Sequence, residues 1–300
     1  MTPRTPIRRA PSVRPATRKP YTGSPIRRTR TIRRASAGLS PIRAGALLAM
    51  LVAAAAIYGV ANSSAFEFRE LRLDGAAYTD PAAVEHVLAD VRGTNLFGMR
   101  TSPLEAGILE LPTVRRADIA VGLPDQLVVR LDERRPILVW RVGAQRYLVD
   151  VDGKLFAEVG DGAPTEAAAL PVVEDLRATA AALVVGSRLE PVDLDAATRL
   201  ASLVATDVGS EAESLQVSVG DANGFVVRAR PQAWRAVFGF YTLSLRTPDL
   251  IPGQVRLLRS LLLGREPLVE RMILASETDG TAILKPTPKP TARPSATPAP

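Results

Sequence analysis

The sequence predicts an α+β protein in which a single membrane-spanning helix precedes two small folded domains. Three observations predict it: an uncharged run from Ala44 to Ala61, apolar residues at helix and strand spacing up to Leu284, and a proline-rich end. We therefore expect five segments. They are a disordered basic tail (1–43), the helix (44–63), two domains (66–135 and 136–284) and a disordered proline-rich tail (285–300).

The uncharged run is long enough to cross a bilayer once. Eighteen residues at about 1.5 Å each would reach roughly 27 Å, close to the ~30 Å hydrocarbon core. Because the run is rich in alanine, a cleaved signal peptide with a site near Ala61-Asn62-Ser63 is the main alternative. Signal sequences are usually shorter and nearer the N-terminus, and a soluble core helix keeps a polar stripe. We expect a retained anchor.

Charge placement predicts the orientation of that helix. Twelve Lys and Arg residues and no Asp or Glu precede Ala44, which favours a cytoplasmic N-terminus with Asn62 onward outside, a single-pass type II arrangement. The tail carries twelve positive charges whereas the whole chain has a net charge of +7, so the remainder of the chain has a small net negative charge. Nucleic acid is therefore not an expected partner. The absence of cysteine excludes thiol catalysis and thiolate metal sites.

The first domain has the pattern β-α-α-β-β. Apolar residues alternate from Phe68 to Leu73, and helical spacing follows Asp80-Pro81 up to Gly93. A second helix is expected to start with Ser102 as its cap and to stop before Pro112, and two strands then flank a turn at Pro124. Two helices on one face of a three-stranded sheet make a small module of the POTRA kind.

The second domain is predicted to be a mixed, mainly antiparallel sheet with helices on one face. Helices are expected after Asp193 or Asp195, with Val204 on the inner face, and over Pro252–Leu263, and a hairpin is expected at Asn223-Gly224. Predicted strands cover residues 137–141, 146–149, 154–158, 170–173, 237–241, 269–276 and 280–284, with a loop at 160–169. The segment Asp150–Gly153 is interpreted as a hairpin turn rather than a calcium loop, since no Glu follows at the required spacing.

The stretch from Leu111 to Trp140 resembles the signature of the FtsQ/DivIB cell-division family. The matching residues are Pro112, Val114, Ala117, Val121, Pro124, Leu127, Glu133, Arg134, Pro136 and Trp140, followed by Asp150 and Gly153 in the next turn. At the junction, Glu133 and Arg134 could tie the two domains by an ion pair or remain two solvated side chains. The resemblance implies a POTRA domain followed by an FtsQ-type β domain.

The resemblance also implies a function. It is that of a non-enzymatic, membrane-anchored divisome scaffold at the division septum, binding FtsB/FtsL-like coiled-coil proteins and the FtsW/FtsI-like septal synthase complex. No cofactor, metal or small-molecule substrate is expected, because His86 is the lone histidine and no catalytic motif is present. The alternatives are a POTRA-type binding or chaperone module for other envelope proteins and, less favoured, a cell-wall enzyme.

The final strand is the expected partner surface. Gly280–Leu284 has neither charge nor proline, and the last strand of a sheet often lies at an edge. The resemblance points to the same place, since FtsQ-like proteins bind FtsB by adding a strand there. The expected contact residues are Ser276, Thr278, Gly280, Thr281, Ala282, Ile283 and Leu284. A proline tail folded back over this edge is the alternative.

Overall fold

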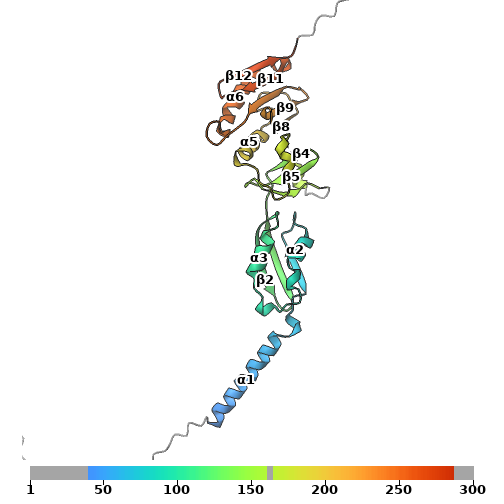
Figure 1. Cartoon of the computed structure of the whole chain (residues 1–300), viewed down its shortest axis with the longest axis vertical. Helices are drawn as coiled ribbons and strands as arrows, with labels where there is room; N and C mark the ends of the chain where they lie inside the picture. The colour runs from blue at the N-terminus through green and yellow to red at the C-terminus, as the bar shows by residue number, and fades with distance from the viewer. Residues whose placement is uncertain (1–39, 161–164, 287–300) are drawn as a thin grey trace, which may run out of the picture. The chain divides into compact units, whose positions relative to one another are not determined.

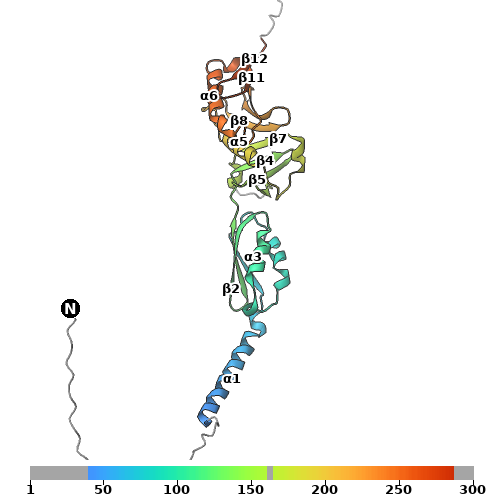
Figure 2. The same cartoon turned by 60° about the vertical axis from the view of Figure 1, so that its left-hand side comes forward.

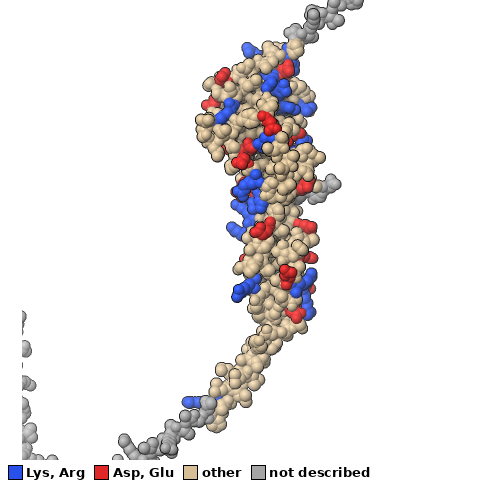
Figure 3. Space-filling model, viewed as in Figure 1, with Lys and Arg blue, Asp and Glu red and all other residues tan. Residues whose placement is uncertain are grey.

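The computed structural model describes residues 40–160 and 165–286. The expected disordered tails therefore lie largely outside the described residues. The chain divides into two compact units, Met1–Ala56 and Ile57–Pro300. Helix α1 (Pro41–Ala61) is, within the described ranges, the one helix long and apolar enough to cross a membrane. It carries Arg43 near its start and no charge beyond it, as the uniformly tan surface in Figure 3 shows.

The first domain is a three-stranded sheet in the order β1-β3-β2 with two helices on one face (Figures 1 and 2). Its strands are β1 (Glu70–Asp74), β2 (Val114–Gly122) and β3 (Gln126–Glu133). Its helices are α2 (Pro81–Val87) and α3 (Thr101–Leu109). The central strand β3 runs parallel to β1 and antiparallel to β2. The order β-α-α-β-β and the layer arrangement agree with the sequence prediction.

The helix ends differ from the prediction in two places. Asp80 caps α2 as expected, since its carboxylate accepts the N–H of Ala82 at 2.9 Å, but α2 ends at Val87 and short 3-10 turns follow. The proposed Ser102 cap is wrong. The helix starts two residues earlier, with Arg100 in the cap position, and makes no side-chain cap, because the chain leaves the preceding 3-10 turn already extended at Arg100.

The second domain is a single nine-stranded sheet in the order β12-β11-β10-β9-β8-β7-β4-β5-β6. Three of its strand pairs, β4–β7, β7–β8 and β10–β11, are parallel and the others are antiparallel. The strands are β4 (Leu138–Val142), β5 (Gln145–Val149), β6 (Leu155–Glu158), β7 (Val172–Asp175), β8 (Ser214–Gly220), β9 (Gly224–Arg230), β10 (Arg235–Gly239), β11 (Val269–Leu274) and β12 (Gly280–Leu284).

The two longer helices of this domain, α5 (Pro191–Ala201) and α6 (Ile251–Leu262), pack on the same face of the sheet. The main core lies between them and the strands, with Trp140, Trp234 and Phe238 fully buried. The one-turn helix α4 (Thr165–Ala168) lies on the other face, where Ala167 joins Val139, Leu148 and Phe156. Within the described residues, the 3-10 turns are Ser64–Phe66, Ala89–Val91, Leu96–Gly98, Ala178–Ala182, Pro248–Leu250 and Glu266–Leu268.

Several element boundaries in this domain also differ. Glu190, rather than Asp193 or Asp195, precedes α5, because Pro191 takes the first helical position. Val204 lies beyond the end of α5 and is exposed, since the helix stops at Ala201. The strand expected at 237–241 starts two residues earlier as β10, and the expected loop at 160–169 contains α4.

Candidate functional site: the β12 edge

Strand β12 forms one edge of the nine-stranded sheet and pairs only with β11. Thr281 lies opposite Ile273 and Ala282 lies opposite Met272 in this antiparallel pair. The side chains of Ile283 and Leu284 are 42% and 55% exposed, while Ala282 packs partly against the main core. The edge therefore offers unpaired backbone groups and apolar side chains without charge protection along its five residues.

The turn before β12 is organised by Ser276. Its hydroxyl oxygen accepts the N–H groups of Thr278 and Asp279 at 3.2 and 2.9 Å, and its own N–H donates to the Asp279 carbonyl. Ser276 and Thr278 thus lie in the turn and Gly280–Leu284 in the strand. The pairing of β12 with β11 continues one residue past the strand, where the backbone N–H of Lys285 donates to the Leu268 carbonyl.

Buried polar side chains hold the ends of β10 and β11 in place. Gln254 on α6 is fully buried; its amide donates to the Leu274 and Phe238 carbonyls and its oxygen accepts the Tyr241 hydroxyl. Arg246 donates to the same two carbonyls and to Ala275. Burial raises the pKa of Tyr241, and the charge of Arg246 opposes that rise only in part. These contacts fix the strand on which β12 rests.

Glu266 holds the other end of β11. It accepts hydrogen bonds from the hydroxyl of Ser210, the backbone N–H of Glu211 and the indole N–H of Trp234. Burial opposes its ionisation, but these hydrogen bonds outweigh burial and hold its pKa below the usual range. None of Gln254, Arg246 or Glu266 was singled out from the sequence, since isolated polar residues carry no motif.

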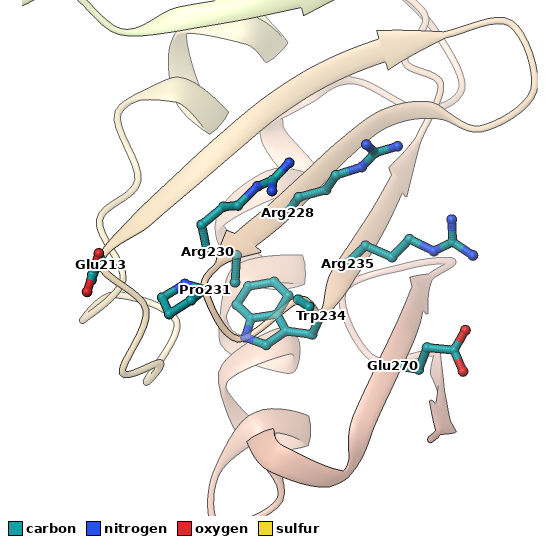
Figure 4. A pocket seen from close by; sticks show the side chains of 9 residues that line it. Glu213, Arg228, Arg230, Pro231, Trp234, Arg235 and Glu270 are labelled. Carbon is teal, nitrogen blue, oxygen red and sulfur yellow. The ribbon is translucent and has the colours of Figure 1, made fainter. Parts of the chain in front are cut away.

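A row of arginines crosses the sheet face opposite α5 and α6. Arg228 on β9 lies opposite Arg235 on β10, which lies opposite Arg271 on β11, and Arg271 lies opposite Ile283 on β12. Figure 4 shows Arg228, Arg230 and Arg235 together above the buried Trp234. They line a shallow hollow of about 630 Å³. This arginine row places positive charge one strand away from the exposed edge.

The FtsQ/DivIB-like residues Glu133 and Arg134 have separate roles at the domain junction. The Glu133 carboxylate accepts the backbone N–H groups of Ala77, Tyr78 and Thr79 at 2.7–3.1 Å, just before α2. Arg134 donates to the Pro112 carbonyl at 3.1 Å and pairs with Asp150 at 2.5 Å. The ion pair between the domains therefore uses Arg134 and Asp150, not Glu133.

Asp150 also shapes the turn that follows β5. Its second carboxylate oxygen accepts the N–H groups of Asp152 and Lys154, both at 2.9 Å. Gly153 has φ +78°, a conformation that side chains disfavour, and a Cβ there would meet the Leu189 carbonyl at 3.3 Å. The segment is thus a turn that the Asp150 carboxylate stabilises by hydrogen bonds.

The remaining FtsQ/DivIB-like residues support the fold. Val114 starts β2 and is buried, Pro124 lies in the β2–β3 turn, and Pro136 follows β3 where the chain enters the second domain. The indole of fully buried Trp140 donates to Asp175 at 3.2 Å. His86 is exposed on α2, and no metal-binding group of His, Cys, Asp and Glu occurs within residues 40–160 and 165–286.

Comparison with known proteins finds similarity over part of the chain. Residues 66–134 match the family described as "POTRA domain, FtsQ-type". The chain is similar to several proteins named "Cell division protein FtsQ". It is 30% identical over 130 residues to "Cell division protein FtsQ" of Chloroflexus aurantiacus, covering 43% of each chain. The FtsQ of Burkholderia pseudomallei is 33% identical, covering 37% of this chain and 44% of the relative.

A third relative extends the range of organisms. The FtsQ of Corynebacterium glutamicum is 32% identical over 84 residues, covering 28% of this chain and 38% of its own length. The chain therefore matches less than half the length of each of these three relatives. The family resemblance read from residues 111–140 is confirmed, and the first domain is an FtsQ-type POTRA domain.

Proposed function

We propose that the chain is a non-enzymatic, membrane-anchored division scaffold. α1 anchors it, with the N-terminus in the cytoplasm and both domains outside, and these domains recruit and link septal proteins. Its relatives are cell division proteins, which supports this role. The observation that carries the proposal is the exposed, uncharged β12 edge of the second domain.

At that edge, an FtsB-like protein, paired with an FtsL-like protein, adds a strand to β12. Main-chain hydrogen bonds supply most of the affinity, and Thr281 and Ile283 set the register. Arg271, directly across from Ile283, supports a preference for acidic residues on that side of the incoming strand, because complementary charge steers encounter and penalises wrong partners. The FtsW/FtsI-like synthase complex joins through this assembly.

The POTRA domain, together with α1, carries the determinants that place the chain at the septum. Full-length protein fused to a fluorescent reporter tests this role, and a chain ending near Arg135 should still concentrate at division sites. A truncated chain that spreads evenly over the membrane would argue against it.

Reporter fusions after Asn62 should be extracytoplasmic, whereas mature protein starting near Ser64 would overturn the anchor.

A two-hybrid test against FtsB-, FtsL-, FtsW- and FtsI-like proteins separates the scaffold from the alternatives. The scaffold predicts interaction with the FtsB/FtsL pair and no cleavage of peptidoglycan by the purified chain. A POTRA-type chaperone predicts binding to unfolded envelope proteins instead. Cleavage activity that survives removal of β12 would favour the cell-wall enzyme.

A further inference from the structure

The start of the POTRA domain is tied to the last residue of α1. The side-chain amide of Asn95 donates to the Ala61 carbonyl at 2.7 Å, and its oxygen accepts the N–H of Phe97 at 2.9 Å. The Ala61 carbonyl is among the last of a helix, which have no partner inside the helix. Both Ala61 and Asn95 belong to the unit Ile57–Pro300. Asn95 thus caps both the C-terminal end of α1 and the N-terminal end of the 3-10 turn Leu96–Gly98.

Further hydrogen bonds make this connection a fixed joint rather than a free linker. Arg69 donates to the Ser64 carbonyl at 3.0 Å, and Phe68 donates to the Thr94 carbonyl at 2.9 Å. Glu67 and Asn95 form an antiparallel bridge between the two segments. The backbone between Ala61 and the POTRA sheet is therefore held at several points.

Three apolar side chains gather at this end of the POTRA domain. The rings of Phe66 and Phe97 meet edge to face with centroids 4.9 Å apart, and Phe97 is 56% exposed. Leu123 is 57% exposed in the β2–β3 turn, whose Asp125 carbonyl accepts the N–H of Arg69 at 2.9 Å. Arg69 and Arg92 lie beside them, joined by a bond from the Arg92 guanidinium to the Arg69 carbonyl.

The joint fixes how far these side chains can lie from a bilayer. Ala61 is the last residue of α1 and of the apolar stretch that precedes Asn62, so its carbonyl marks the boundary of the hydrocarbon core if α1 spans the membrane. Asn95 contacts that carbonyl, and two residues of chain reach at most about 7 Å, so Phe97 lies within roughly one headgroup layer of the boundary. Phe and Leu side chains of interfacial segments enter the boundary between headgroups and acyl chains, and arginine pairs with phosphate.

We propose that Phe66, Phe97 and Leu123 form a membrane-seated surface that enters the headgroup region of the phospholipid bilayer, with Arg69 and Arg92 on lipid phosphates. The inference rests on the proposed spanning of the membrane by α1. A bilayer is the occupant because the covalent connection and the Asn95 bond bring it to this surface without any further partner.

Tryptophan fluorescence of the full chain in phospholipid nanodiscs tests this surface. Both native tryptophans, Trp140 and Trp234, are fully buried in the second domain and give a constant background. Phe97→Trp and Leu123→Trp each add one reporter at an exposed position, and Leu245→Trp adds a control at a residue 92% exposed in the second domain. Each variant is compared in nanodiscs of ordinary and of chain-brominated phosphatidylcholine, where bromine quenches nearby indole.

The expected result is that Phe97→Trp and Leu123→Trp lose most of their added emission in brominated lipid while Leu245→Trp loses none. Added emission from residues 97 and 123 that matches the Leu245→Trp control would overturn the proposal. A blue shift without bromine quenching would also overturn it, since it would mean that protein covers the surface. Co-elution of each variant with the nanodisc is measured first and tests α1 separately, so failure of the anchor and failure of the lipid-seated surface are distinguishable.

Discussion

The side-chain oxygen of buried Gln254 accepts a hydrogen bond from the Tyr241 hydroxyl at 2.7 Å. Its amide nitrogen donates to the carbonyl of Leu274, the last residue of β11. This pair connects helix α6 to the strand on which β12 rests. The stability of the β12 edge therefore depends on a polar side chain that is fully buried.

Gln254→Ala should lower the free energy of unfolding of the second domain by about 2–4 kcal/mol, because the Tyr241 hydroxyl and the Leu274 carbonyl lose a buried partner. Denaturant unfolding of the detergent-solubilised chain measures this. Ser260→Ala removes an exposed hydroxyl from the same helix and should change stability by less than about 0.5 kcal/mol. Equal effects of the two variants would contradict the role assigned to Gln254.

The lowered pKa of Glu266 predicts that the stability of the second domain depends on pH. Its pKa is lowered in the folded chain, so its stabilisation is fully present above the unfolded value of about 4.3 and is lost as pH falls through the folded pKa. Glu266→Gln should therefore be less stable than the natural chain near pH 7, and the gap should close in acid below about pH 4. Thermal unfolding of both proteins across this range checks it. A gap that stays constant with pH would be inconsistent with an ionised Glu266.

Arg134→Ala should destabilise the junction by about 1.5–3 kcal/mol, since it leaves Asp150 without its cation. Arg130→Ala is the matched control. Its ion pair with Asp118 spans 3.6 Å between side chains that are more than half exposed and should contribute below about 1 kcal/mol. Chemical denaturation compares the two. If Arg130→Ala were the costlier change, the junction would have to be reinterpreted.

Much of the POTRA domain could be predicted because its signals are local. Asp80-Pro81 starts α2, and Pro124 marks the β2–β3 turn, each within a few residues of chain. The failed Ser102 cap shows the limit of such signals. A Ser-x-x-Glu spacing permits a cap, but the entry of the chain at Arg100 decides whether it forms.

The candidate site was predicted only in part. The place of Gly280–Leu284 as the last strand of the chain predicted an edge strand, and the structure places that strand at the edge. The arginine row could not be predicted, because Arg228, Arg235 and Arg271 become neighbours only through the register of β9, β10 and β11. The Arg134–Asp150 pair likewise joins elements whose contact depends on tertiary packing.

Arg235→Glu tests the charge of the arginine row. It places a carboxylate between Arg228 and Arg271, so it should stabilise the free domain by about 0.2–1 kcal/mol by replacing repulsion with attraction. The same variant should slow association with an FtsB-like segment at low salt, because the steering charge is reduced. Surface plasmon resonance at two salt concentrations measures the rates. Arg256→Glu, an exposed charge on α6, is the control and should leave association unchanged.

Amide hydrogen exchange of the second domain within the full chain, with and without the extracytoplasmic segment of an FtsB-like protein, tests the β12 edge most directly. Successive backbone N–H groups of a strand point to opposite sides, so alternate amides of Gly280–Leu284 face away from β11 and should exchange quickly in the free protein. Strand addition predicts that these amides become protected on binding, while the amides already bonded to β11 change little. Binding that leaves the exchange of all β12 amides unchanged would contradict the account.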